Sequence, residues 1–133
     1  MSDTTRILAG ILLLSLVTVE TGGLYLVKLV RGAAPATPFQ LGFARAGHAH
    51  AGVLLVLSLT ALLYADSVHV TGLWGWLSRI GVPTAALLMP AGFFFSSMGE
   101  GRSTPNGFIA LVYTGAVVLA AGLTSLGIGL LVA

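Results

Sequence analysis

Cysteine is absent from the 133 residues, and charged side chains are scarce. Without cysteine the chain can form no disulfide, no thiolate metal site and no cysteine nucleophile. Only 8% of the residues are Asp, Glu, Lys or Arg, whereas about a quarter are charged in an ordinary soluble domain. Because 56% of the residues are hydrophobic, too few polar groups remain to cover a surface in water. The composition therefore predicts a membrane protein in contact with the lipid bilayer.

Basic residues exceed acidic ones only slightly, with six Lys and Arg against four Asp and Glu. The six bases are scattered and form no run, so we expect no nucleic-acid partner. The sequence also contains no P-loop, no dinucleotide-binding glycine motif and no Ser-His-Asp set. These absences remove the commonest classes of nucleotide enzyme and hydrolase.

Four apolar stretches are long enough to cross a bilayer, which needs about 20 residues per helix. They cover approximately residues 7–30, 43–65, 74–98 and 106–132. The connectors are short, so consecutive helices should lie side by side and run antiparallel. The sequence thus predicts an all-α polytopic membrane protein, an up-down four-helix transmembrane bundle, with residues 1–133 as one membrane domain.

The residues on either side of the first span carry further signals. Pro35 and Pro38 are expected to keep the first connector non-helical. Arg6 before an apolar stretch is typical of a signal peptide, but no small-residue cleavage site follows, so we expect the first span to be retained.

The distribution of bases indicates the orientation. The first and third connectors and their flanks carry four bases, against two at the opposite face. This bias favours termini outside the cytoplasm, in a bacterial or archaeal cytoplasmic membrane.

Ionisable residues within apolar spans are costly and usually mark function. Glu20 lies about ten residues inside the end of the first span, and His48 and His50 lie near the start of the second. Glu100 closes the third span at the same face. We therefore expect a His/Glu cluster here that holds a transition metal or haem through His48, His50 and Glu20. Glu20 and Glu100 are also candidates for a proton relay; alternatively, Glu20 is a protonated interhelical contact and Glu100 a solvated charge.

The two histidines cannot share one ligand in a regular helix. Successive residues turn by about 100°, so positions two apart point about 200° away from each other. Either Gly47 and Gly52 loosen the helix, or one imidazole faces the bundle and the other faces a second subunit or the headgroups. We favour His50 for the inward role because it lies deeper. His69, in the second connector, is too far along the chain to join them and is expected to face solvent.

The segment AGHAHAGVL, residues 46–54, resembles small four-helix relatives of haem–copper oxidase subunit I. Those proteins carry an H-A-H segment at a comparable place. The resemblance implies that His48 or His50 touches a metal or haem. The run Phe93, Phe94 and Phe95 is then a candidate wall for a haem slot, although ordinary lipid contact is the commoner role of such a run.

Two further hypotheses stand beside metal or haem binding. The segment LLLSLVTVETGGLYLVK resembles the first helix of small multidrug-resistance transporters, which implies a proton-coupled transporter in which Glu20 exchanges protons. Alternatively, the chain is a non-catalytic accessory subunit of a larger membrane complex. The fourth span has small residues at helical spacing, which favour close packing inside the bundle or in a homo-oligomer. The residues we assign to that packing are Gly115, Ala121, Ser125 and Gly129.

Overall fold

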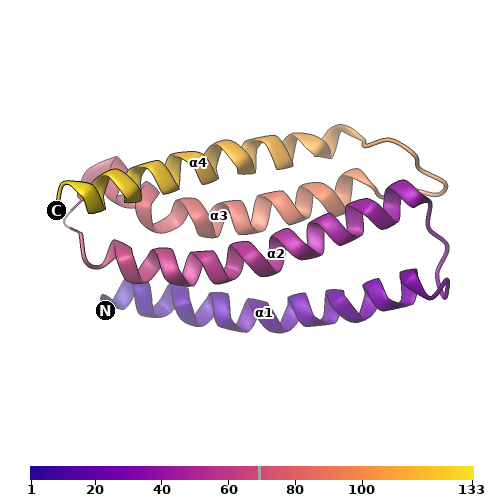
Figure 1. The fold of residues 1–133 in the computed structure, drawn as a ribbon, viewed down its shortest axis with the longest axis horizontal. Coiled ribbons are helices and arrows are strands. Elements are labelled where there is room, and N and C mark those ends of the chain that lie inside the picture. Colours follow the sequence, from indigo (N-terminus) through magenta and orange to yellow (C-terminus); the bar gives the residue numbers. More distant parts are fainter. Residues whose placement is uncertain (69) are drawn as a thin grey trace.

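The computed structural model describes residues 1–68 and 70–133 of the chain. Its long helices are α1 (Asp3–Val30), α2 (Pro38–Ala65), α3 (Gly72–Ser96) and α4 (Ala110–Leu131), with a 3-10 turn, η1 (Gly107–Ile109), ahead of α4. Each runs antiparallel to the next, and both termini lie at the end where α2 connects to α3 (Figure 1). In this described part of the chain, four helices are long and apolar enough to cross a membrane. The predicted all-α, up-down arrangement of an integral membrane protein is confirmed.

The helices lie in sequence order, with α1 and α4 at the two sides of the bundle (Figure 1). Helix α3 packs extensively against both α2 and α4, whereas α1 packs mainly on α2. The fully buried Leu62 of α2 and Val82 of α3 mark the core between these central helices. As a result α1 exposes most of its circumference, and only Thr5, Leu12 and Leu29 are buried in it.

Helix α2 begins five residues before the predicted start at Phe43, and Pro38 belongs to the helix. The expectation that Pro38 keeps the connector non-helical is wrong, because proline fits the first position of a helix, where its missing N–H costs nothing. Thr37 and Gln40 form a capping box: the Thr37 hydroxyl accepts from the Gln40 N–H and the Gln40 amide oxygen accepts from the Thr37 N–H. The capping box marks the start of the helix, and it lies before the most apolar part of the span, from which the start was predicted.

The same capping residues join the two connectors at that end of the bundle. The Gln40 amide nitrogen donates to the carbonyl oxygens of Ser97 and Gly99, at 3.0 and 2.7 Å. The Thr37 hydroxyl donates to the carbonyl oxygen of Arg102. The start of α2 is therefore tied to the end of α3 and to the connection toward α4.

The small residues of α4 pack against the chain's own α3 and the connector before it. A Cβ added to Gly115 would lie 2.5 Å from Met89 Cγ, and one added to Gly129 would lie 2.6 Å from Val70 Cγ2. The Ser125 hydroxyl donates to the carbonyl oxygen of Trp74 at 2.6 Å, and Ala121, four residues earlier in α4, is half-buried. Of the two alternatives for this face, packing within the chain is the one observed.

Candidate functional site

His48 lies in a notch on the neighbouring helix. A Cβ added to Gly23 of α1 would lie 3.2 Å from His48 Cε1 and 3.4 Å from Nε2, and one added to Gly22 would lie 3.7 Å from Nδ1. The two glycines thus let the imidazole ring approach the backbone of α1, where any side chain at Gly23 would crowd it. Within residues 1–68 and 70–133, no hydrogen bond to the His48 ring is formed, in contrast to His50. The ring is half-buried and its nitrogens are free to bind another group.

The His48 ring borders a cleft of about 260 Å³ between α1, α2 and α3, which we call the His48 cleft. Its residues come from three helices. They are Ser15, Thr18, Val19, Gly22, His48, Ala51, Leu55, Ala86, Leu87, Pro90 and Phe94. Apart from the imidazole and two hydroxyl groups, these side chains are apolar. The cleft therefore combines apolar walls with a small number of polar groups, which is the usual composition of a small-molecule site.

Hydrogen-bond acceptors also line the His48 cleft. The hydroxyls of Ser15 and Thr18 donate to the carbonyl oxygens of Ile11 and Ser15, at 2.8 and 2.6 Å, so their oxygens keep acceptor capacity. Pro90 has no N–H, so it cannot donate the helical hydrogen bond to the carbonyl of Ala86, one turn earlier in the same wall. The cleft therefore combines one imidazole with the acceptor-capable hydroxyl oxygens of Ser15 and Thr18.

His50 has different neighbours from His48. Its Nδ1 lies 2.8 Å from the carbonyl oxygen of Ala46, one turn back in α2, and its ring lies 4.8 Å from that of Phe93. A carbonyl only accepts, so Nδ1 carries the proton and, in the neutral ring, Nε2 is an acceptor. Helix α2 is regular through Gly47 and Gly52, so the loosened helix that would let both rings share one ligand is absent. Both rings are half-buried, and it is His48, our second candidate for the inward role, that lines the cleft.

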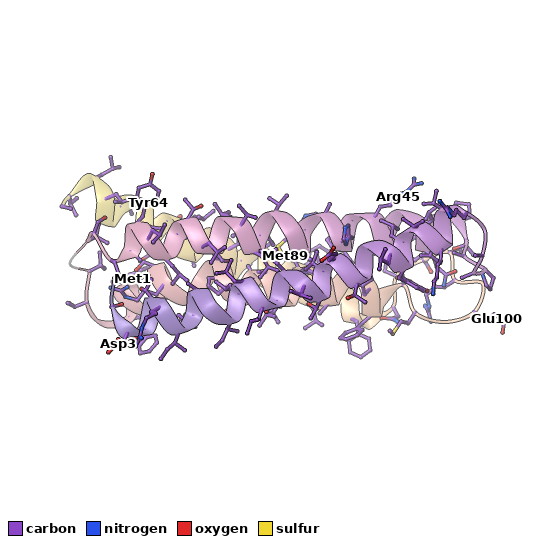
Figure 2. The ribbon with its side chains drawn as sticks, turned by 90° about the horizontal axis from the view of Figure 1, so that it is seen from below. Met1, Asp3, Arg45, Tyr64, Met89 and Glu100 are labelled. Atoms are coloured by element: carbon purple, nitrogen blue, oxygen red, sulfur yellow. The ribbon has the colours of Figure 1, made fainter. Side chains whose placement is uncertain are left out.

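The acidic candidates do not join the imidazoles in the described residues. Glu20 is exposed on α1. Glu100 is exposed in the connection after α3, at the end of the bundle opposite Met1 (Figure 2). Among residues 1–68 and 70–133, no group of three His, Cys, Asp or Glu side chains could hold a metal ion. The expected His48, His50 and Glu20 ligand set is therefore not assembled there. Binding of metal or haem through one imidazole stays a prediction, and His69 lies outside the described residues.

A polar cluster at the opposite end of the bundle was not anticipated. The Asp66 carboxylate accepts hydrogen bonds from the Ser2 N–H and hydroxyl, from the Thr5 hydroxyl and from Arg79 Nη1, at 2.6, 2.9, 2.8 and 2.6 Å. The Ser2 N–H, with Arg79 and the hydroxyls, holds the pKa of Asp66 well below its usual range, against the opposing effect of burial. The cluster joins the start of α1 to the end of α2 and to α3.

The signal for this cluster was present in the sequence. Arg79 lies two turns inside an apolar helix, where a base needs an acidic partner, and Asp66 follows directly on the apolar run of α2. In the sequence Arg79 is one of the two bases at the face of the termini, and its position within the apolar span was not assigned a role. Its partner was missed because Asp66 follows α2 and Arg79 lies within α3, and sequence spacing alone does not specify a contact between two helices.

Comparison with known proteins adds no relative to this description. No protein-family model, curated protein or solved structure matches the chain.

Proposed function

We propose that this integral membrane protein binds a lipid-soluble small molecule in the His48 cleft, with the His48 imidazole as the polar contact. The observation that carries this proposal is the half-buried ring, which lines an apolar cleft and has no hydrogen bond from the described residues. No hydrogen bond to the ring comes from residues 1–68 and 70–133, and an imidazole nitrogen that meets acyl chains without a partner is unfavourable, so bound ligand or water is expected at these nitrogens. The glycine notch on α1 keeps the ring in this position.

The position of the cleft along the helices supports entry from the bilayer. Thr18 of α1 and Leu87 of α3 are exposed at its edge, and both lie well inside their helices rather than near the connectors. At this depth the surroundings of a membrane-spanning helix are acyl chains. A molecule that partitions into lipid therefore reaches the cleft without crossing the connectors.

The polar groups of the cleft favour a particular chemical class. Neutral imidazole offers one donor and one acceptor, and the Ala86 carbonyl and the hydroxyl oxygens add acceptors. Apolar walls that include Phe94 and Pro90 suit a flat ring. A quinone or hydroquinone, which carries oxygen groups on a flat ring, matches both features. Its oxygens would bond to His48 while its ring and tail contact the walls.

This proposal can be tested by nuclear magnetic resonance on protein with 15N-labelled histidine, reconstituted in lipid. The probe is a 1,4-naphthoquinone with a short alkyl tail. We expect a saturable shift of the His48 ring signals and little change at His50, whose ring has other neighbours. Ala51→Leu, which fills the cleft, should weaken binding by about tenfold or more, the effect of losing roughly 1.4 kcal/mol.

Ala49→Leu is the matched control, because Ala49 is exposed on the same helix and does not line the cleft. Equal weakening by both variants, or equal shifts of His48 and His50, would contradict a site at His48. So would the absence of saturable shifts together with the absence of any co-purified lipid-soluble molecule that depends on His48.

A metal or haem is a second candidate, and the geometry favours His50 for it. Metal-ligating histidines usually donate their other ring nitrogen to a carbonyl or carboxylate, as His50 Nδ1 does to Ala46. In this case the purified protein should show a haem absorption band or stoichiometric metal that His50→Ala abolishes. The same preparation of His48→Ala should retain it.

We also propose which end of the helix bundle faces the cytoplasm. The connections after α1 and α3, with their flanks, carry Lys28, Arg31, Arg45 and Arg102, whereas the other end carries Arg6 and Arg79. Arg79 is also neutralised by Asp66, which weakens its influence on orientation. The bias supports a cytoplasmic location for the connections after α1 and α3, and an external location for the termini.

A further inference from the structure

Helix α1 presents a continuous outward face that no other part of residues 1–68 and 70–133 covers. Residues at alternating spacings of three and four are all exposed along it, which is the pattern of a helix–helix seam. They are Ile7, Gly10, Leu14, Val17, Thr21, Leu24 and Lys28. The half-buried and buried residues of α1 lie on the other side, toward α2. We call the outward set the α1 seam.

Glu20 lies beside the α1 seam and shows that this face is not simply a lipid contact. It is exposed, and it lies ten residues before the end of α1, within the apolar part of the helix. Intramembrane carboxyl groups almost always face other protein groups or a water-filled cavity. Glu20 does not line the His48 cleft, and residues 1–68 and 70–133 offer it no hydrogen bond or ion pair, so we expect its partner to come from another molecule.

Heptad geometry identifies that group when the partner is a second copy of the chain. With Leu14, Thr21 and Lys28 at position a and Gly10, Val17 and Leu24 at position d, Glu20 takes position g and Tyr25 position e. In a parallel pair of helices, a g residue faces the e residue of the next heptad on the other helix. Glu20 would therefore meet Tyr25 of the second copy. A carboxyl group and a phenol can donate to or accept from each other.

We propose that two copies of this chain associate in parallel through the α1 seam, with reciprocal hydrogen bonds between Glu20 and Tyr25. Twofold symmetry makes the face self-complementary, so each copy supplies both groups. Tyr25 is 53% exposed, and the part of it that faces inward borders a pocket with residues of α2, α3 and the nearby connections. Gly10 and Thr21 are small enough to let the backbones approach, and the Lys28 ammonium reaches toward the headgroups.

The alternative face for self-association is already occupied. The small residues of α4 are used against α3, where Gly81 and Gly122 bring the two backbones into contact. The small-residue face of α4 is therefore not available for contact between copies. Helix α1, with its mid-membrane carboxyl group, is the element whose polar groups call for a partner.

The absence of cysteine makes the test direct, because single cysteines cross-link without background. We expect oxidation of native membranes to cross-link Leu14→Cys, Val17→Cys, Thr21→Cys and Leu24→Cys into dimers. Val53→Cys on α2 and Val117→Cys on α4 are matched controls, since those positions are 66% and 70% exposed, like Leu24 at 65%. The controls should cross-link at least fivefold less.

The polar pair is tested on the Val17→Cys background. Tyr25→Phe and Glu20→Leu should each reduce cross-linking severalfold, the double variant should be no worse than either, and Glu20→Gln should retain most of it. Equal cross-linking at Val53 or Val117, or a dimer indifferent to Glu20→Leu and Tyr25→Phe, would overturn the proposal. Products with the mass of one chain plus a different protein would also overturn it, in favour of another partner on the same face.

Discussion

Asp66 illustrates how much one side chain at a helix end can hold together. Its carboxylate collects hydrogen bonds from Ser2, Thr5 and Arg79, which belong to the N-terminus, α1 and α3. The ion pair with Arg79 is mostly shielded, with 25% of the Arg79 and 16% of the Asp66 side chain exposed. Because α1 has little else to anchor its first turn, we expect this residue to govern the attachment of that turn.

Asp66→Asn should destabilise the protein by about 1.5–3 kcal/mol, the usual value for hydrogen bonds to a charged group, because Arg79 loses its counter-charge. The measurement is thermal unfolding in a mild detergent. Asp3→Asn is the control: its pair with Arg6 is 88% and 67% exposed, and such pairs contribute about 0–1 kcal/mol. A loss of equal size in both variants would contradict a special role for Asp66.

The lowered pKa of Asp66 also predicts an acid sensitivity with a definite sign. A carboxyl group whose pKa is lower in the folded state stabilises the fold fully above the unfolded pKa, about 3.9. That contribution is lost as the pH falls from there through the folded pKa. We therefore expect the unfolding temperature to fall below about pH 4 in the wild type and to fall less steeply in Asp66→Asn. Parallel curves for the two proteins would show that other groups control the acid response.

At the scale of helices, the contact between α3 and α4 depends on the absence of side chains. A Cβ added to Gly81 would lie 2.6 Å from Gly122 Cα, so the two backbones touch. Close approach of this kind is how helices in lipid gain contact energy, because burial of apolar surface contributes little between them. Replacement of either glycine must push the helices apart.

Gly122→Ala should therefore destabilise the protein by about 1–3 kcal/mol, the usual cost of overpacking. Gly127→Ala, on the same helix, is the matched control, because its added Cβ meets nothing within 4 Å. Alanine is the better helix former by up to about 1 kcal/mol, so the control should be neutral or more stable. Unfolding in detergent by heat distinguishes the two variants, and similar values for both would mean that α3 and α4 are not in tight contact.

For the whole molecule, the order of the helices predicts an uneven stability. Helix α3 has ten buried residues, among them Val82 and Ala85, whereas α1 has three. Regions with few buried contacts open locally at lower free energy than the core. In lipid nanodiscs, amide hydrogen exchange at matched depths in the bilayer should be faster in α1 than in α3.

The α1 interface adds a condition to that expectation. If two copies pair through α1, exchange in the middle of α1 should slow as the protein-to-lipid ratio rises, while exchange in α3 stays the same. Uniform exchange along all four helices at every ratio would contradict the uneven stability.

Much of the architecture could be read from local patterns in the chain. The apolar stretches identified the number and order of the helices, since only hydropathy and length are needed for that. The short connectors indicated antiparallel neighbours, and the small residues of α4 indicated close packing, as observed at Gly115 and Gly129. The start of α2 was misplaced, because the capping box at Thr37 and Gln40 lies outside the apolar stretch.

Hydropathy and spacing were therefore enough for the membrane class and the order of the four helices, because both depend on residues close together in the chain. The direction of each polar side chain depended on packing between helices. Helices that are apolar all round carry a weak amphipathic signal, so their rotation is set by contacts such as Gly81 with Gly122 and His48 with Gly23. That rotation turned Glu20 outward, brought His48 into a cleft and joined Asp66 to Arg79.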